Sequence, residues 1–219
     1  MHIETLFDQG TARLSEDAQL VRLPFCVVAD GVSPPYNDAN PLLMVQGRSA
    51  GAVVAALACD TFAAAPTADS AHAVIVRANQ TVGALQQGWG RSLERPDLLA
   101  GASAVAVKLT DLVEIVQIGD AMACWRMRSG EIGAPDNLGY AHEEHLLAIV
   151  TRIMAEVGGD REAMWEQYYE LRCASLWEHT NRQGPLGFSV LNGQPEASEL
   201  IQEHGLLREK LECLILCSD

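Results

Sequence analysis

Two apolar runs in this chain each end on an aspartate. Residues 25–29 lead into Asp30 and Gly31, and residues 214–218 lead into Asp219, with which the sequence ends. Short aliphatic and β-branched runs of this kind predict buried strands. A carboxylate at the end of a buried strand is costly unless its charge is offset, and two such ends side by side repel each other. A hard divalent cation with oxygen ligands, Mg²⁺ or Mn²⁺, would relieve both penalties.

The composition indicates a folded protein that does not bind polyanions. Of 219 residues, 48% are hydrophobic, and the formal net charge is −14. The hydrophobic content is ample for a core, and no basic stripe is present that could replace the counterions of a nucleic acid. We therefore expect neither a nucleic-acid partner nor an anionic membrane surface as a partner.

Cysteine usage and hydropathy favour the cytoplasm. The six cysteines form no Cys-x-x-Cys pair, and most lie in apolar runs, as free thiols do in reducing compartments. The first residues lack the pattern of a signal peptide, and no apolar run reaches the roughly 18 residues of a membrane-spanning helix. We expect a cytoplasmic, monomeric protein in which residues 1–219 form a single domain.

The order of elements predicts an α+β domain. Strands are expected within residues 18–30, 102–109, 112–118, 121–127, 188–191, 197–201 and 211–217, and helices over 48–63, 69–89, 142–157 and 161–178. The three strands between 102 and 127 are separated by short turns, which is typical of a β-meander. Cys213 and Cys217 lie on one face of the last strand, and we expect that face in the core. Strands in two sets with helices in pairs favour a layered fold over a doubly wound one.

Five motifs stand in an order that resembles the metal-dependent type 2C Ser/Thr protein phosphatases (the PPM family), and their short loops resemble its compact bacterial branch. Each motif is weak alone, but together they cover nearly the whole chain. They are Arg13-Leu14-Ser15-Glu16-Asp17, Val27-Val28-Ala29-Asp30-Gly31-Val32, Gly101-Ala102-Ser103-Ala104, Ile118-Gly119-Asp120-Ala121-Met122-Ala123 and Leu214-Ile215-Leu216-Cys217-Ser218-Asp219.

The resemblance implies a fold, an activity and a set of site residues. The implied fold is a central β-sandwich of two antiparallel sheets flanked by paired helices in α-β-β-α layers. The implied activity is hydrolysis of phosphoserine or phosphothreonine on a protein, by a water that two Mn²⁺ or Mg²⁺ ions activate. The implied metal ligands are Glu16, Asp17, Asp30, Gly31 through its carbonyl, Asp219 and, near a third ion, Asp120. Asp30 would bridge both main ions, and Arg13 would hold the phosphate.

Three departures from the family pattern leave a second interpretation open. Arg13 precedes Glu16 by three positions, whereas the family usually shows four, and Ser33-Pro34-Pro35 replaces a Gly-Gly pair. The family continues beyond the position of Asp219 to a further metal-binding aspartate, so we expect a missing C-terminal strand and helix segment. The alternative is a catalytically inactive phosphatase-like module that binds or regulates. A weaker alternative is an unrelated α+β enzyme with coincidental Asp-Gly turns.

The sequence His142-Glu143-Glu144-His145 superficially resembles a zinc motif. Its histidines are three positions apart rather than the four of His-Glu-x-x-His. We therefore interpret this segment as the polar start of a helix.

Overall fold

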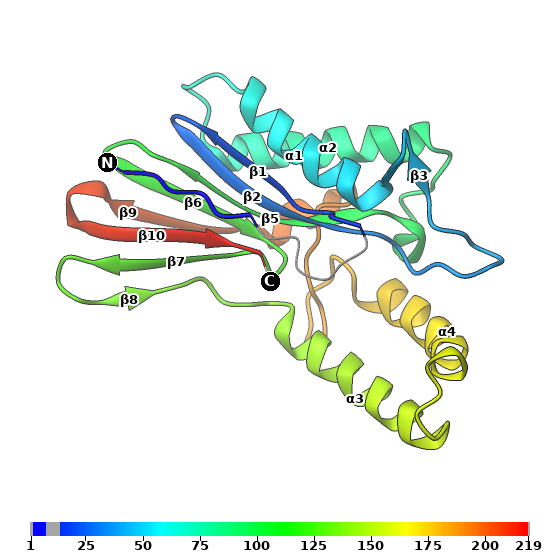
Figure 1. The fold of residues 1–219 in the computed structure, drawn as a ribbon. Coiled ribbons are helices and arrows are strands. Elements are labelled where there is room, and N and C mark those ends of the chain that lie inside the picture. The colour runs from blue at the N-terminus through cyan, green and yellow to red at the C-terminus, as the bar shows by residue number, and fades with distance from the viewer. Residues whose placement is uncertain (1, 8–13, 219) are drawn as a thin grey trace.

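The computed structural model describes residues 2–7 and 14–218, and in this part of the chain it shows an α+β fold. A five-stranded antiparallel sheet has the order β1-β2-β5-β6-β9, and a three-stranded sheet has the order β10-β7-β8. The strands are β1 (Ala18–Arg22), β2 (Phe25–Val32), β5 (Gly101–Lys108), β6 (Leu112–Ile118), β7 (Met122–Met127), β8 (Ile132–Gly133), β9 (Gln202–Leu207) and β10 (Leu211–Cys217). Figure 1 shows the two sheets lying close to each other.

Two hydrophobic clusters cover the two faces of the larger sheet. One lies between the sheet and the helix pair α1 (Ala50–Ala64) and α2 (Ala71–Gly88), and it includes Phe25, Val27 and Ala29 of β2. The other lies between the sheets, where Cys26 and Val28 of the same strand pack with residues of β7 and β10. Because side chains alternate along a strand, the three central strands β2, β5 and β6 contribute to both clusters.

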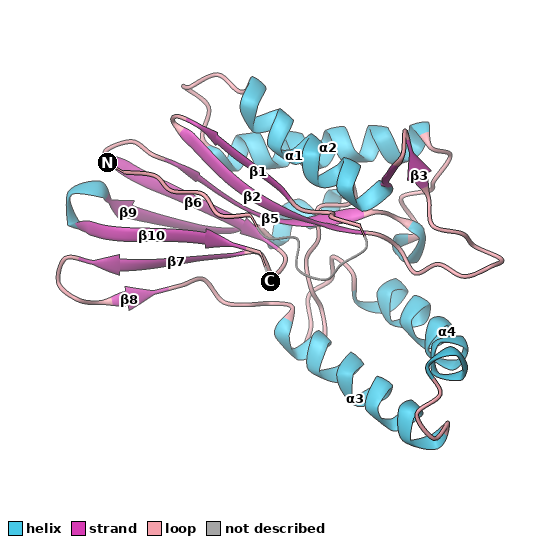
Figure 2. Cartoon of the chain, viewed as in Figure 1, coloured by secondary structure: helices cyan, strands magenta, loops and turns pink. Residues whose placement is uncertain are grey.

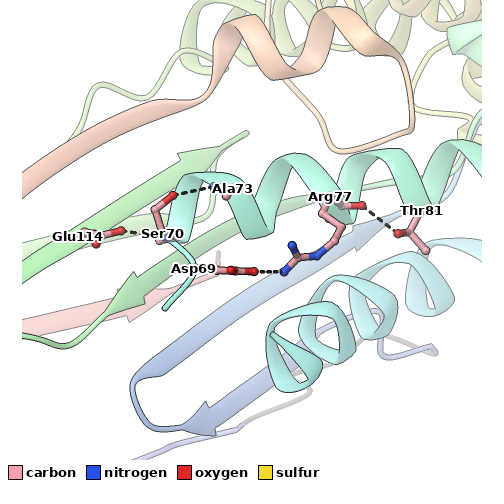
Figure 3. Close-up of polar contacts among 7 residues, drawn as sticks. Asp69, Ser70, Ala73, Arg77, Thr81 and Glu114 are labelled. Atoms are coloured by element: carbon pink, nitrogen blue, oxygen red, sulfur yellow. Dashed lines mark hydrogen bonds and ion pairs between the residues drawn. The ribbon is translucent and has the colours of Figure 1, made fainter. Parts of the chain in front are cut away.

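Helix α2 is fixed to the sheet at its first turn (Figure 3). The N-cap residue Ser70 accepts a hydrogen bond from the backbone N–H of Ala73 at 3.1 Å. Glu114 of β6 accepts a second one from the N–H of Ala71 at 2.8 Å. A carboxylate at this position satisfies an N–H group that the helix leaves unpaired and interacts favourably with the helix dipole.

The expected β-meander is wrong in its last strand. β5 pairs with β6, but β7 leaves this sheet and pairs with β10 and β8. The change of sheet follows Gly119. Its φ of +80° is a backbone conformation that residues other than glycine rarely adopt. A short turn in the sequence therefore marks a crossing between sheets and not a third hairpin strand.

Other differences concern the C-terminal third. Residues 197–201, expected as a strand, fall largely in a 3₁₀ helix over Pro195–Leu200, and the strand β9 follows it. Residues 188–191 make isolated bridges only. Cys213 and Cys217 are exposed, so the expectation of a core position is wrong, because Leu214 and Leu216 take the inward face of β10.

The small hairpin of β3 (Met44–Val45) and β4 (Arg48–Ser49) had no signal in the sequence.

The second helix pair consists of α3 (Tyr140–Glu156) and α4 (Arg161–His179), as expected. Figures 1 and 2 show that it projects beside the ends of the strands and does not lie over the smaller sheet. Consistent with this, Ile215 on the outer face of β10 is 56% exposed. In the described part of the chain, none of the helices has the combined length and apolar character needed to cross a bilayer.

Candidate functional site

The first hairpin places the two N-terminal acidic motifs side by side. β1 and β2 pair with Ala18 opposite Ala29, and the N–H of Gly31 donates to the carbonyl of Glu16 at 3.2 Å. Continuing this register by one residue places Asp17 opposite Asp30. The hairpin therefore joins residues that are thirteen positions apart in the sequence, which the acidic motifs predicted.

Asp30 and Asp17 lie on the face of the sheet that meets the second sheet. Cys26 and Val28 pack into the cluster between the sheets, and alternation puts the Asp30 side chain on the same face. Asp17 shares that face because it lies opposite Asp30. Both residues are half-buried. Two carboxylates on one partly covered face form the kind of oxygen-rich environment that divalent cations occupy.

Glu16 lies on the other face of the sheet. Its Oε1 accepts a hydrogen bond from the hydroxyl of Ser33 at 2.6 Å. A Cβ on Gly51 would be 3.0 Å from the same oxygen, which places the carboxylate beside the first turn of α1. The helix dipole stabilises an anion there without any metal. The structure thus separates Glu16 from Asp17, although the two are neighbours in the sequence.

Gly31 lies at the closest backbone approach in the site. A Cβ at this position would be 2.4 Å from the carbonyl oxygen of Gly51 and 2.8 Å from that of Glu16. The main chains of β1, β2 and α1 therefore meet where a side chain would not fit. This arrangement fits a site in which the Gly31 carbonyl serves as a ligand, since the donors offered are hard oxygens.

Asp120 follows Gly119 at the end of β6 and is half-buried. A Cβ on Gly119 would be 2.4 Å from the Cβ of Ser103, and Ser103 is the residue opposite Asp30. Asp120 is thus separated from Asp30 by one strand, on the side of the sheet away from Asp17. This position is compatible with a peripheral role in the same site.

Two buried polar residues near Asp30 were given no role by the sequence analysis. Ser103 of β5 is 3% exposed and Gln117 of β6 is fully buried. Alternation places both on the face of Asp30, because Val105 and Ile115 on the same strands belong to the cluster between the sheets. The available signal was a polar residue at an inward position of an otherwise apolar strand.

The loop that follows the Asp-Gly motif is attached to α4. Asn40 donates to the hydroxyl of Tyr169 at 3.2 Å, and the indole N–H of Trp165 donates to the carbonyl of Tyr36 at 3.3 Å. Tyr169 is buried, whereas Trp177 is 44% exposed. The α3–α4 pair is thereby connected to the segment next to the candidate site.

The remaining predicted site residues, Arg13 and Asp219, lie outside the described residues. Within residues 2–7 and 14–218, no group of three or more His, Cys, Asp or Glu side chains is arranged to hold a metal ion. The described part of the candidate site therefore consists of the Asp17–Asp30 pair, the Gly31 carbonyl and nearby Asp120, with Glu16 on the opposite face.

No protein-family model and no curated protein sequence matches this chain. Among solved structures, a bacterial serine phosphatase matches 96% of the chain over 75% of its own length, with 15% identity and a TM-score of 0.56. A variant of a bacterial serine phosphatase, with an arginine replaced by lysine, matches 93% of the chain over 70% of its own, with 14% identity and a TM-score of 0.50.

A third match is the catalytic domain of the serine/threonine protein phosphatase PstP in complex with two manganese ions. It covers 90% of this chain and 69% of its own length, with 17% identity and a TM-score of 0.48. At these identities the similarity concerns the fold. The fold that the sequence resemblance predicted, an α+β domain with the architecture of bacterial serine phosphatases, is confirmed by the first two structures.

Proposed function

We propose that this protein is a metal-dependent phosphoprotein phosphatase that hydrolyses phosphoserine or phosphothreonine. The observation that carries the proposal is the β1–β2 register, which places Asp17 opposite Asp30 on the inner sheet face. Support comes from the fold, which is shared with a bacterial serine phosphatase. The substrate would be a phosphorylated protein, and the protein would act as a cytoplasmic monomer.

The proposed site uses residues from separate parts of the chain. Asp30, Asp17, the Gly31 carbonyl and Asp219 would hold two Mn²⁺ or Mg²⁺ ions. Glu16, also expected as a ligand, lies on the other face of the sheet, where Ser33 donates to its carboxylate. When bound, the ions supply a water of lowered pKa and offset negative charge on the phosphoryl group.

The chain's own groups would prepare and orient the reactants. Asp120 would contribute to a third ion, and Arg13 would bind the phosphate. The Asp17 and Asp30 carboxylates would hold the ions at the end of the sheet, and the ions would supply the attacking water there. Because water is the nucleophile, no phosphorylated side chain is expected during turnover.

Hydrolysis of p-nitrophenyl phosphate with Mn²⁺ tests the proposal. We expect Asp30→Asn to reduce kcat/KM more than about a hundredfold, because a neutral amide cannot replace a metal-binding carboxylate. Asp111→Asn is the matched control, since Asp111 is exposed in the turn at the other end of the same sheet and should leave the rate unchanged. Equal rates for wild type and Asp30→Asn would remove the assigned role.

The position of Glu16 favours a second candidate function, an inactive phosphatase-like module for binding or regulation. The Glu16 carboxylate is already held by Ser33 and the start of α1, so it needs no metal in order to be stabilised. Calorimetric titration with Mn²⁺ separates the two functions. Two tight sites together with phosphatase activity would exclude the inactive module, whereas absence of both would exclude the enzyme.

A further inference from the structure

The turn that carries Asp120 is held by a serine from a distant segment. The backbone N–H of Gly119 donates to the hydroxyl oxygen of Ser189 at 2.9 Å, a buried contact between residues 70 positions apart. Ser189 itself is 3% exposed. Because β6 ends at Ile118 and β7 begins at Met122, Gly119 lies outside both strand ladders. A buried N–H requires an acceptor, and at this turn the serine oxygen is the acceptor.

Gly119 depends on this contact because its backbone could adopt other conformations. Glycine populates positive and negative φ about equally, and here φ is +80°. A Cβ at Gly119 would be 2.4 Å from the Cβ of Ser103 and 3.3 Å from the carbonyl oxygen of Ser189. The turn is therefore enclosed by β5 on one side and by the segment of Ser189 on the other, and the hydrogen bond selects one conformation of the glycine.

The position of Asp120 is set by this turn. The residue is half-buried, and no side chain among the described residues forms a hydrogen bond or an ion pair with its carboxylate. The backbone that carries the carboxylate therefore determines where it lies. Asp120 is one strand away from Asp30, so a rotation of the peptide between Gly119 and Asp120 would move its carboxylate relative to the Asp17–Asp30 pair.

The segment that supplies the serine is anchored to the same sheet. Leu191 and Ala102 of β5 exchange two backbone hydrogen bonds, at 2.9 Å and 3.0 Å. The N–H of Val190 donates to the side-chain oxygen of Asn181 at 2.8 Å. Ala102 lies opposite Gly31 in the β2–β5 register. The serine is thus held at a fixed place relative to the strands that carry the candidate site.

We infer that Ser189 is a positioning residue, which acts through its hydrogen bond with Gly119 to hold Asp120 where its carboxylate can bind a peripheral divalent cation. This inference rests on the proposed function, because it needs Asp120 to be a ligand. It requires no contact of Ser189 with the cation or with the carboxylate. Groups that position metal ligands contribute about 10- to 100-fold to metal affinity.

Ser189→Ala tests the inference. We expect the most weakly bound Mn²⁺ to lose about tenfold in affinity, and the Mn²⁺ concentration for half-maximal hydrolysis of p-nitrophenyl phosphate to rise by a similar factor. The electron paramagnetic resonance signal of unbound Mn²⁺ measures the affinity without turnover. Asp120→Asn should show a loss at least as large. In the double variant Ser189→Ala should add nothing to Asp120→Asn, because no ligand is left for the serine to position.

Ser70→Ala is the matched control. The Ser70 hydroxyl also accepts a hydrogen bond from a backbone N–H, that of Ala73 at 3.1 Å, but it lies at the start of α2, on the other side of the larger sheet. Both variants leave a backbone N–H without its acceptor, so both should lower the Tm of the metal-free protein, by about 2–8 °C. Only Ser189→Ala should weaken Mn²⁺ binding.

Ser189→Cys is a second variant, which keeps nearly the same side-chain volume and offers a weaker acceptor to Gly119. It should also weaken Mn²⁺ binding, and it provides the measurement if Ser189→Ala does not fold.

The outcomes separate the inference from the proposed function. If the wild type binds Mn²⁺ and the Ser189 variants bind it equally well, the role of Ser189 is overturned and the proposed function stands. The same holds if Ser189→Ala weakens binding by the same factor with and without Asp120→Asn, which would show a purely structural serine. A wild type that neither binds Mn²⁺ nor hydrolyses the phosphate ester would overturn both the proposed function and the inference.

Discussion

Gly31 lies at a position where the surrounding backbone leaves no room for a Cβ atom. A side chain at this position would overlap the carbonyl oxygens of Gly51 and Glu16, both of which belong to the backbone. Backbone atoms of a strand and of the first turn of a helix cannot move independently of the elements that contain them. An added methyl group must therefore push β1 or α1 away from β2.

Gly31→Ala tests this close packing. We expect the free energy of unfolding to fall by about 1–3 kcal/mol, the usual cost of inserting a methyl group into a filled space. Equilibrium denaturation in urea measures the change. Gly88→Ala serves as the control, because a Cβ at that position would meet no atom within 4 Å and α2 would gain a better helix former. If both variants lost the same stability, the close approach at Gly31 would not be the cause.

At the same scale, the sequence predicted that the Glu16-Asp17 and Asp30-Gly31 segments meet, but not which face of the sheet each side chain takes. Glu16, Asp17 and Asp30 were recognisable as strand-end carboxylates, and the structure places their strands next to each other. The separation of Glu16 from Asp17 follows from the register of β1 against β2, which the hydrogen bond from the N–H of Gly31 to the carbonyl of Glu16 continues. A shift by one residue would exchange the two faces, and no local pattern in the sequence fixes that choice.

At the scale of elements, His142 is a buried contact of the second helix pair. This residue, at the start of α3, is 4% exposed, and its ring lies 4.3 Å from that of Phe188 and 5.7 Å from that of His179, measured between ring centroids. The polar helix start expected here is thus also a buried contact. Burial lowers the pKa of His142 to about 4, and the neighbouring His179 and Arg172 act in the same direction.

The lowered pKa of His142 predicts a loss of stability in acid. Between pH 6.5 and about 4 the unfolded chain binds a proton that the folded chain excludes, so the free energy of unfolding decreases as the pH falls. The full contribution is on the order of 3 kcal/mol. His142→Phe, which keeps an aromatic ring beside Phe188, should be less sensitive to pH over this range.

Urea denaturation of wild type and His142→Phe at pH 7 and pH 4.5 measures this effect, because the difference between the two proteins cancels the titration of the other groups. Parallel pH profiles would contradict a buried neutral histidine. His2→Phe is a suitable control, since His2 is exposed and is not among the groups that act on the pKa of His142, so its removal should not change the slope.

Elements defined by local signals were predictable, whereas those defined by distant partners were not. The four helices were located from their periodicity and breakers, and Ser70 and Asp160 cap two of them as N-cap chemistry requires. β9 and the transfer of β7 to the smaller sheet were missed, because both depend on strands far away in the sequence. The outward face of Cys213 and Cys217 was missed for the same reason.

At the scale of the whole molecule, charge and site make separate contributions to stability. The formal net charge of −14 means that acidic groups repel each other across the folded protein. Any salt screens this repulsion, and a divalent cation does so without a specific site. A metal centre at Asp30 would add a separate contribution to the free energy of unfolding, because an ion that binds only the folded state stabilises that state by mass action.

Thermal unfolding with and without Mn²⁺ separates these two terms. At constant ionic strength, set with NaCl, Mn²⁺ at a hundred times its dissociation constant should stabilise the wild type by about 2.7 kcal/mol. For a chain of this size that corresponds to a rise in Tm of roughly 5–10 °C. Asp30→Asn should lose this rise but keep the response to NaCl, since it removes one of 29 acidic residues. An equal rise in both proteins would assign the effect of Mn²⁺ to general screening and not to a site at Asp30.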